Sequence, residues 1–277
     1  MKEKASKQQP PRVFSLLKLW LQEHYLSLPK RLQSVAVYAL HHPDMMALNT
    51  IAVISEQAGV TPSTMIRFAK SLGYKGFSDM QIVFQESMRH MPQPYAARIH
   101  DLGEQMPGEI SALQRFAAAA GNAINKLAQT DDQSLLQASR KLAEAHTIYI
   151  AGQGRAAPVS TYLHYLLIKM EMQAVLLEGM PVMVADKARL IKRNEVLLAV
   201  SFSPYTANTR ELVDICANRQ VPVVSITDST LSPIARRDAM HLEVLEKEVS
   251  GFRGLSATMC LAQCLAVEAG KYHSNMD

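Results

Sequence analysis

The spacing of apolar residues changes once along the chain, and that change constrains the fold more than any other feature of the sequence. From Val13 to about His90 the apolar side chains recur at the spacing of amphipathic helices, and no β-rich run interrupts them. After His146, short runs of apolar and β-branched residues alternate with helical stretches. The sequence therefore predicts two domains: an all-α bundle of about five short helices, followed by an α/β domain with a parallel sheet.

Five runs in the second part are expected to form the strands of that sheet. Most are apolar throughout, as strands are when helices cover both faces of a parallel sheet. The last run is the weakest of the five, and an apolar helix over Leu255–Lys271 is expected to close the chain. The runs are Thr147–Ala151, Ala174–Leu177, Val196–Val200, Val221–Ile226 and His241–Leu245.

Prolines mark the boundary between the two domains. The run Met91-Pro92-Gln93-Pro94 places two prolines one residue apart, which ends a helix and stiffens the chain. We therefore expect a first domain over residues 1–90, a linker over residues 91–110 and a second domain over residues 111–277.

The net charge of +4 is concentrated in the first domain. Residues 1–90 hold 11 Lys and Arg against 6 Asp and Glu, a charge of +5, whereas the remainder carries −1. A basic first part joined to a near-neutral remainder favours an anionic partner for the first part alone. A basic surface without a particular partner is the alternative that charge leaves open.

The composition argues against several classes of protein. No apolar run approaches the roughly 18–20 residues of a membrane-spanning helix. The polar N-terminus lacks the apolar segment of a secretory signal, and three scattered cysteines are too few for a disulfide framework. We therefore expect a cytoplasmic protein without a membrane partner. Cys260 and Cys264 share one helix face, but they are expected to be buried apolar residues rather than a metal site, and no cofactor is expected.

A turn between two short helical segments is the most specific motif of the first domain. A helix fits Thr50–Ala58, Gly59 allows the tight turn, and Thr61 with Pro62 caps and begins a second helix. In a helix-turn-helix, the second helix enters the DNA major groove and its N-terminal residues reach base edges. A helical hairpin without a DNA role is the alternative.

Periodicity divides the second helix of this motif into two sides. Its buried side is expected to hold Ile66, Phe68, Ala69 and Leu72. The residues left on the exposed side and at the N-terminus carry hydroxyls and positive charges, which suit phosphate oxygens and base acceptors. The candidate DNA-binding residues are therefore Thr61, Ser63, Thr64, Arg67 and Lys70, with Lys75 placed to reach the flanking DNA backbone.

The stretch from Leu28 to Gln85 resembles the N-terminal domain of the RpiR (MurR/RpiR) family of bacterial transcriptional regulators. Members of that family carry a sugar-isomerase (SIS) domain behind the helix-turn-helix. The resemblance therefore implies an SIS-type α/β fold for the second domain. The matching residues are Ala58-Gly59-Val60-Thr61, Ser63-Thr64, Arg67-Phe68 and Leu72-Gly73-Tyr74-Lys75-Gly76-Phe77.

Two loops of the second domain are candidates for a ligand site. One follows the first expected strand and the other follows the third, where open α/β sheets bind their ligands. Their glycines, hydroxyls and helix N-termini suit an anion. The candidate ligand-binding residues are Gly152, Gln153, Gly154, Arg155, Ser201, Ser203, Thr206, Thr209 and Arg253, the last of which precedes the closing helix and is expected to face the site.

Two positions depart from the loop patterns of the SIS family. Where the family has Gly-x-Gly-x-Ser and Ser-x-Ser-Gly-x-Thr, this chain has Ala156 in place of the first loop's serine and Pro204 in place of the second loop's glycine. Each change removes a hydrogen-bond donor. Arg155 is expected either to replace a lost contact as a clamp for phosphate or carboxylate, or to lie solvated on the surface.

The resemblance and the loops together imply a metabolite-responsive transcriptional regulator. The first domain would bind operator DNA. The second would bind a small anionic metabolite, first of all a sugar phosphate, and carry the contacts of a homodimer or homotetramer. No catalytic residue is assigned, because Asn208 and Asp228 lie near strand ends without an identifiable base partner. The alternatives are an SIS-class sugar-phosphate isomerase or lyase, and a ligand-independent DNA-binding assembly protein.

Overall fold

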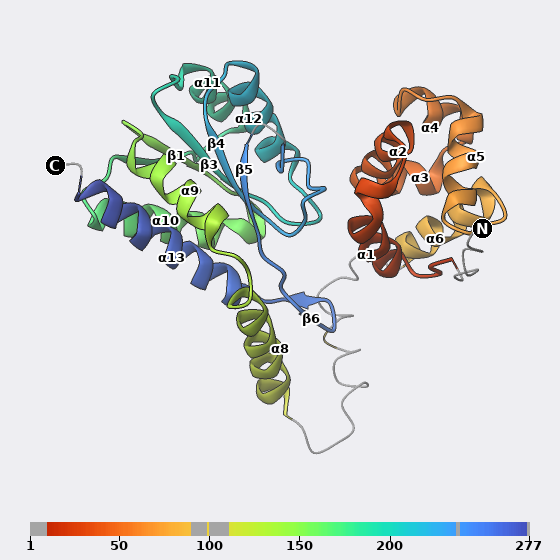
Figure 1. Cartoon of the computed structure of the whole chain (residues 1–277), viewed down its shortest axis with the longest axis horizontal. Helices are drawn as coiled ribbons and strands as arrows, with labels where there is room; N and C mark the ends of the chain where they lie inside the picture. The colour runs from red at the N-terminus through yellow and green to blue at the C-terminus, as the bar shows by residue number, and fades with distance from the viewer. Residues whose placement is uncertain (1–9, 90–98, 100–110, 237–238, 276–277) are drawn as a thin grey trace, which may run out of the picture. The chain divides into compact units, whose positions relative to one another are not determined.

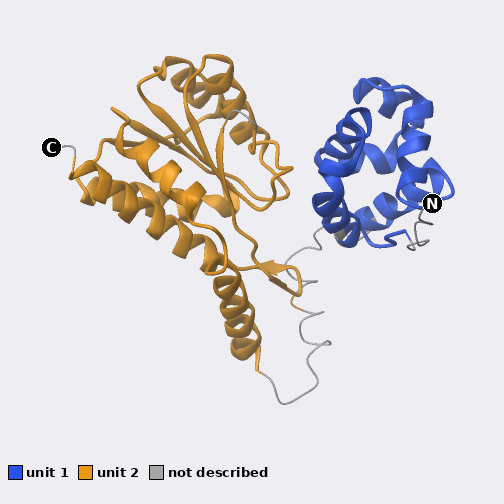
Figure 2. Cartoon of the chain, in the orientation of Figure 1, with its two compact units in different colours: residues 1–97 blue, residues 98–277 orange. Residues whose placement is uncertain are grey.

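Two units account for the residues that the computed structural model describes, which are residues 10–89, 99, 111–236 and 239–275 (Figure 2). The first unit spans residues 1–97 and the second spans residues 98–277. Apart from Ile99, the predicted linker over residues 91–110 lies outside the described residues. None of the described helices combines the length and apolarity that crossing a bilayer requires.

The described part of the first unit is all helical, as the spacing of its apolar residues predicted (Figure 1). It contains six α-helices, where about five were expected. Their apolar sides meet in one core, in which Leu17, Val35 and Phe84 are completely buried. The helices are α1 (Phe14–His24), α2 (Lys30–His41), α3 (Pro43–Leu48), α4 (Ile51–Gln57), α5 (Pro62–Ser71) and α6 (Phe77–Arg89).

The second unit is built on a five-stranded parallel sheet, which confirms the predicted α/β class. The strand order is β2-β1-β3-β4-β5, so the chain moves to one side of β1 and then crosses to the other. All five expected runs form strands, although β4 begins two residues later than the pattern suggested. The strands are β1 (Ile148–Ala151), β2 (Ala174–Leu176), β3 (Val196–Val200), β4 (Val223–Thr227) and β5 (Met240–Glu243).

Helices cover both faces of this sheet (Figure 1). Successive side chains of a strand point to opposite faces, so neighbours such as Leu197 and Leu198 of β3 belong to different apolar clusters. Burial on both sides explains why the strands are apolar throughout. One face carries α9 (Gln133–Ala143), α10 (Ala157–Lys169) and α13 (Ser256–His273), and the other carries α11 (Pro181–Leu190) and α12 (Ala207–Asn218).

One further helix extends beyond the sheet layer (Figure 1). Helix α8 (Ala112–Leu127) begins with a capping box, in which the Ser111 and Gln114 side chains each bond the other residue's backbone N–H. It packs against α13, and of its residues Ala119 and Ala123 are buried. This helix is the first described element after the segment that joins the second unit to the first.

A short antiparallel hairpin, which the sequence pattern did not predict, lies between β5 and α13. Its strands are β6 (Glu248–Val249) and β7 (Phe252–Arg253). The two residues between them, Ser250 and Gly251, have φ values of 47° and 77°. Positive φ at both central residues is the geometry of a type I′ turn, which is common in two-residue hairpin loops.

Replacing Gly152 with alanine is expected to destabilise the second unit by about 1–3 kcal/mol, because the added Cβ enters a packed region. The new atom would lie 2.1 Å from Ser160 Oγ and 3.2 Å from the Val200 carbonyl oxygen. Gly121→Ala in α8 is the control, because nothing lies within 4 Å of a Cβ there and alanine favours helix. Urea denaturation measures both variants, and equal midpoints would contradict the packing argument.

Candidate functional site

Helices α4 and α5 form a helix-turn-helix whose turn at Gly59 and cap at Thr61 are those that the sequence predicted, whereas Thr50, expected as the first residue of its helix, instead caps α4. The Thr50 side chain accepts a hydrogen bond from the Val53 amide at the start of α4. Gly59, in the turn, has a φ of +64°, a conformation that glycine adopts without steric cost. Thr61 Oγ1 accepts from the Thr64 amide at 3.4 Å, and Pro62 follows in the first turn of α5. The cap therefore fixes the residue at which α5 begins.

Most of the predicted DNA-binding residues lie on the surface, but Thr64 does not. Only 8% of Thr64 is exposed, and its hydroxyl lies 3.0 Å from Thr61 Oγ1. Conversely, Ile66 was expected to be buried and is 39% exposed, while Met65 is completely buried. The face assignment was wrong at these positions because the buried stripe of α5 runs through residues 64, 65, 68, 69 and 72. The exposed candidates are Thr61, Ser63, Arg67, Lys70 and Lys75.

The backbone at Lys75 is fixed by an acidic side chain. Asp79 Oδ2 accepts a hydrogen bond from the Lys75 amide at 2.9 Å, and Asp79 Oδ1 pairs with Arg12 at 2.6 Å. The Arg12 guanidinium, with the Lys75 amide, lowers the pKa of the Asp79 carboxyl, which therefore stays ionised. The Lys75 side chain remains exposed beyond the end of α5. A backbone held in place beside an exposed lysine side chain suits contact with DNA phosphates.

In the second unit, the two candidate loops meet at the carboxyl edge of the sheet. Strands β1 and β3 pair side by side up to Ala151 and Ala199, and the loops follow directly. Because β2 lies on the other side of β1, this is the point where the strand order reverses, and open α/β sheets bind ligands there. Asn208 Nδ2 donates to Gln153 Oε1 at 3.2 Å and so joins the two loops.

The predicted ligand residues divide into buried and accessible groups. Ser201 and Thr209 are 2% and 1% exposed, and Thr209 Oγ1 lies 2.7 Å from Thr206 Oγ1, so these hydroxyls shape the loop from within. Packing leaves no room for a Cβ at Gly152, as the distances above show. The candidates that solvent reaches are Gly152, Gln153, Gly154, Arg155, Ser203 and Thr206, and the Arg253 side chain is described next.

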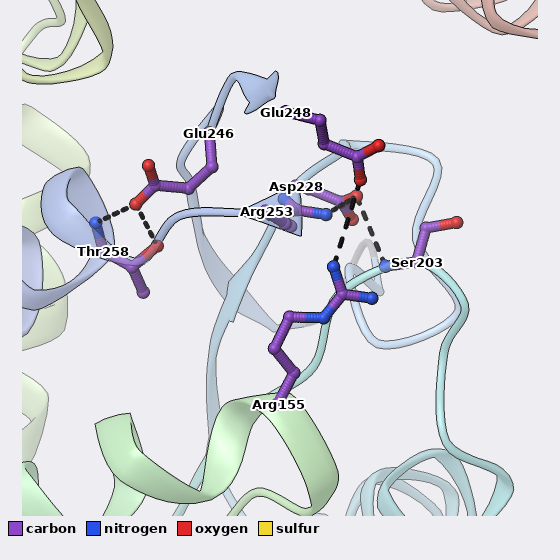
Figure 3. A network of polar contacts seen from close by, with 7 residues as sticks. All are labelled: Arg155, Ser203, Asp228, Glu246, Glu248, Arg253 and Thr258. Carbon is purple, nitrogen blue, oxygen red and sulfur yellow. Dashed lines mark hydrogen bonds and ion pairs between the residues drawn. The ribbon is translucent and has the colours of Figure 1, made fainter. Parts of the chain in front are cut away.

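Arg253 lies beside the second loop, but it faces a carboxylate of the chain itself (Figure 3). Its Nη1 donates to Asp228 Oδ2 at 2.9 Å, and the two side chains are only 6% and 5% exposed. The same Asp228 oxygen accepts from the Ser203 amide at 3.3 Å. The Arg253 guanidinium also lies 4.8 Å from the centre of the Phe202 ring. Arg253 therefore holds the second loop through Asp228, a role that the sequence did not suggest.

Asp228 is the residue of this site that the sequence analysis undervalued. It directly follows β4, the strand next to β3, so its carboxylate reaches the same edge of the sheet. Burial and the nearby Asp228 carboxylate raise the pKa of the Tyr205 phenol, which stays protonated as a hydrogen-bond donor. The available signal was position: a carboxylate immediately after a central strand of a parallel sheet.

Arg155 has a looser ion pair at the outer side of the same region (Figure 3). Its Nη1 lies 3.9 Å from Glu248 Oε1 on β6, and the two side chains are 39% and 53% exposed. A long, solvent-exposed ion pair contributes little to stability, so Arg155 can leave Glu248 for another anion at little cost in free energy. Of the two arginines beside these loops, Arg155 is therefore the one open to an incoming anion.

A separate pocket of about 440 Å³ opens between α8, α9, β5 and α13, and it contains none of the candidate ligand residues. Leu135, His241, Cys260 and Cys264 are among the residues that line it. Cys264 is exposed and Cys260 partly so, which corrects the expectation that both are buried. Among the described residues, no group of three or more His, Cys, Asp and Glu side chains is arranged to hold a metal.

Breaking the buried Arg253–Asp228 pair is expected to cost about 3–5 kcal/mol in either Asp228→Asn or Arg253→Met, because each leaves the other group without its counter-charge. The double variant is expected to recover much of that loss. Arg236→Met is the matched control, since Arg236 pairs with Asp214 at 3.0 Å but the two side chains are 33% and 41% exposed. Urea denaturation gives the four free energies of unfolding, and additive single losses would contradict a direct interaction.

Comparison with known protein families gives a match in each unit. Residues 16–90 match the model of a helix-turn-helix domain of the rpiR family. Residues 141–269 match the model of the SIS domain. The first match includes α4 and α5, and the second includes the whole parallel sheet with both candidate loops.

Two curated relatives share about a quarter of their aligned residues with this chain. The uncharacterized HTH-type transcriptional regulator YfhH of Escherichia coli is 25% identical over 254 residues, which cover 88% of this chain and 86% of YfhH. The bifunctional protein glk of Burkholderia thailandensis is 26% identical over 225 residues, which cover 78% of this chain but only 34% of that protein.

A solved structure extends the similarity to nearly the whole chain. The Vibrio vulnificus NanR protein complexed with ManNAc-6P is 20% identical, with a TM-score of 0.53, and the match covers 94% of this chain and 96% of NanR. At this level of identity the likeness shows a shared fold.

Proposed function

The chain belongs to the RpiR family of helix-turn-helix transcriptional regulators and carries an SIS domain, and from this premise we propose that it is a metabolite-responsive regulator of transcription. Its first unit binds operator DNA, and its second unit binds a small anionic metabolite. The observation that carries the proposal is the presence, in one chain, of an exposed basic helix-turn-helix and of two loops with accessible Arg155, Ser203 and Thr206 at the strand-order reversal of a parallel sheet, the place that we call the ligand crevice.

The DNA contacts are proposed for the exposed side of α5 and the turn after it. Thr61 and Ser63 stand at the N-terminus of the helix, where residues of a recognition helix reach base edges. Arg67 lies one turn further on, and Lys70 and Lys75 follow toward the flanking phosphates. Thr64 is left out of this set, because its burial and its contact with Thr61 give it a role in the helix cap.

The ligand is proposed to bind at the crevice between the first and second loops. Arg155 offers a guanidinium that an anion can recruit, and Ser203 and Thr206 offer hydroxyls on the opposite loop. The NanR complex with ManNAc-6P supports sugar phosphates as the first class to test. A charged ligand that bridges both loops would change the contacts of each, which is the differential binding that a regulator requires.

The site is proposed to bind its ligand without turnover. Asp228, the buried carboxylate of this site, is held by Arg253 and the Ser203 amide, whereas a general base must accept the substrate's proton. An SIS-class isomerase or lyase is the alternative, and the match of the second unit to the SIS domain is the observation in its favour. Interconversion of aldose and ketose phosphates by the purified chain would overturn the proposal of a purely binding site.

Two copies of the chain are proposed to act together. A helix-turn-helix dimer places two recognition helices about one DNA turn apart, or a multiple of it, and so reads a palindromic operator. The second unit is proposed to carry the dimer or tetramer contacts, and the cytoplasm of a bacterial cell is the proposed location. Light scattering of the full chain, alone and with operator DNA, measures the number of copies.

Arg67→Ala is expected to weaken operator binding by about 1–3 kcal/mol and to relax sequence preference if the guanidinium contacts a base edge. The operator is obtained by selecting genomic fragments with the wild-type chain, and affinity is measured by fluorescence anisotropy at fixed salt. Arg219→Ala, which removes an exposed arginine at the end of α12, is the control and is expected to bind normally. Unchanged affinity in Arg67→Ala would remove this residue from the interface.

Ser203→Ala is expected to reduce the ligand-induced rise in melting temperature while leaving operator affinity unchanged. A ligand at 100 times its Kd stabilises the folded state by about 2.7 kcal/mol, so loss of a hydroxyl contact is measurable in a thermal-shift series. Ser134→Ala, which removes an exposed hydroxyl at the start of α9, is the control.

The compounds for that series fall into two sets. One contains ManNAc-6P, glucose 6-phosphate and inorganic phosphate, and the other contains unphosphorylated sugars, amino acids and carboxylic acids. Stabilisation by the second set alone would contradict a sugar-phosphate ligand, since the departures at Ala156 and Pro204 would then mark a changed ligand class. An equal response in Ser203→Ala and wild type would exclude the Ser203 hydroxyl from the site.

A further inference from the structure

A single segment of the second unit touches the ligand crevice, the last helix and α8. This segment, residues 246–253, contains the β6–β7 hairpin, and we refer to it as the strap (Figure 3). The chain just before the strap is anchored: Val244 N donates to the Thr227 carbonyl oxygen at 2.8 Å, at the end of β4. Glu246 Oε1 then accepts from the amide and the hydroxyl of Thr258 at 2.8 and 2.9 Å, which fixes it to the first turn of α13.

Beyond these anchors, each strand of the strap holds one ligand loop. Glu248 on β6 pairs with Arg155 of the first loop. Arg253 on β7 pairs with Asp228, whose same oxygen accepts from the Ser203 amide of the second loop. The two residues that we propose for anion binding are therefore already engaged by the strap. Arg155 pairs with Glu248 of the strap, and the Ser203 amide binds Asp228, which pairs with Arg253 of the strap.

The opposite side of the strap contacts α8. The Phe252 ring on β7 meets Phe116 of α8 edge to face, with ring centres 6.4 Å apart and planes at 71°. Strand β6 also packs against this helix. Helix α8 starts at Ala112 and is the first helix of the second unit whose bounds the structure gives, so in the sequence it stands between the helix-turn-helix and the sheet.

We propose that the strap is the coupling element between the ligand crevice and α8. An anion that recruits Arg155 releases Glu248, and an anion that takes the Ser203 amide competes with Asp228 and so disturbs its pair with Arg253. Either event changes the contacts of β6 or β7, which carry the Phe252–Phe116 contact on their other side. The coupling role rests on the proposed function, because it explains how a bound metabolite alters α8. The mechanical link itself exists without ligand or DNA, and coupling between two sites is reciprocal.

The test uses hydrogen–deuterium exchange of the full chain, without ligand or DNA. Phe116→Ala removes the α8 side of the ring contact at a side chain that is already 36% exposed. We expect exchange to rise about two- to tenfold both in the strap and in the amides of residues 201–203, Tyr205 and Thr206, because the loops lose a contact that stabilises them. Leu113→Ala on the same helix, at a side chain that is 78% exposed, is the control and is expected to leave both segments unchanged.

A second variant tests the link from the crevice. Glu248→Gln keeps the size of an exposed side chain and removes its charge, and reciprocity requires faster exchange in residues 112–118 of α8. A rise confined to α8 and the strap in Phe116→Ala, with residues 201–206 unchanged, would overturn the proposal, as would equal effects of Phe116→Ala and Leu113→Ala. These outcomes are independent of the ligand screen and operator assay above, so failure of the coupling and failure of the regulatory function are separately visible.

Discussion

The central strand β3 is the constraint on which the second unit depends. All five of its residues are completely buried, and its backbone pairs in parallel with β1 on one side and β4 on the other. Because parallel strands end at one edge, this pairing brings together the residues that follow each of the three strands: Gln153, Ser203 and Asp228. A shift of one residue in register would exchange the two faces of β3 and separate these groups. The crevice therefore follows directly from the packing of the sheet.

The same edge holds a buried charge pair, which shapes what the crevice can bind. Burying an ion costs several kcal/mol unless its partner and hydrogen bonds replace the lost water, and here Asp228 receives both the Arg253 guanidinium and the Ser203 amide. The Asp228 carboxylate is thus an anion of the chain itself that already binds the loop after β3. An incoming anion meets Arg155 as the accessible cation, whereas Arg253 is already neutralised. The charge balance of the crevice is set by which arginine is buried with its partner.

Local sequence rules predicted the helix-turn-helix correctly but assigned the buried face of α5 wrongly at two positions. The cap at Thr61 and the turn at Gly59 follow from backbone preferences that act over a few residues, so they could be predicted without tertiary information. The exposure of Ile66 and the burial of Thr64 could not, because a helix of ten residues tolerates a rotation of its apolar face by one position. Packing against the other helices of the bundle decides that rotation. In the second unit, likewise, the glycine pattern at residue 152 was visible, but only the contact with Ser160 shows that packing requires it.

The amino-acid sequence by itself determined the two classes of domain, the order of strands and helices along the chain, and the positions of the loops that follow β1 and β3. These depend on periodicity and turn chemistry, which act between residues close in sequence. Only the tertiary structure decided that Arg253 engages Asp228, that Arg155 is the accessible arginine, and that the strap joins both loops to Phe116. Each of these contacts joins residues at least 25 positions apart. The spatial order of the strands sets their partners, and no local preference encodes it.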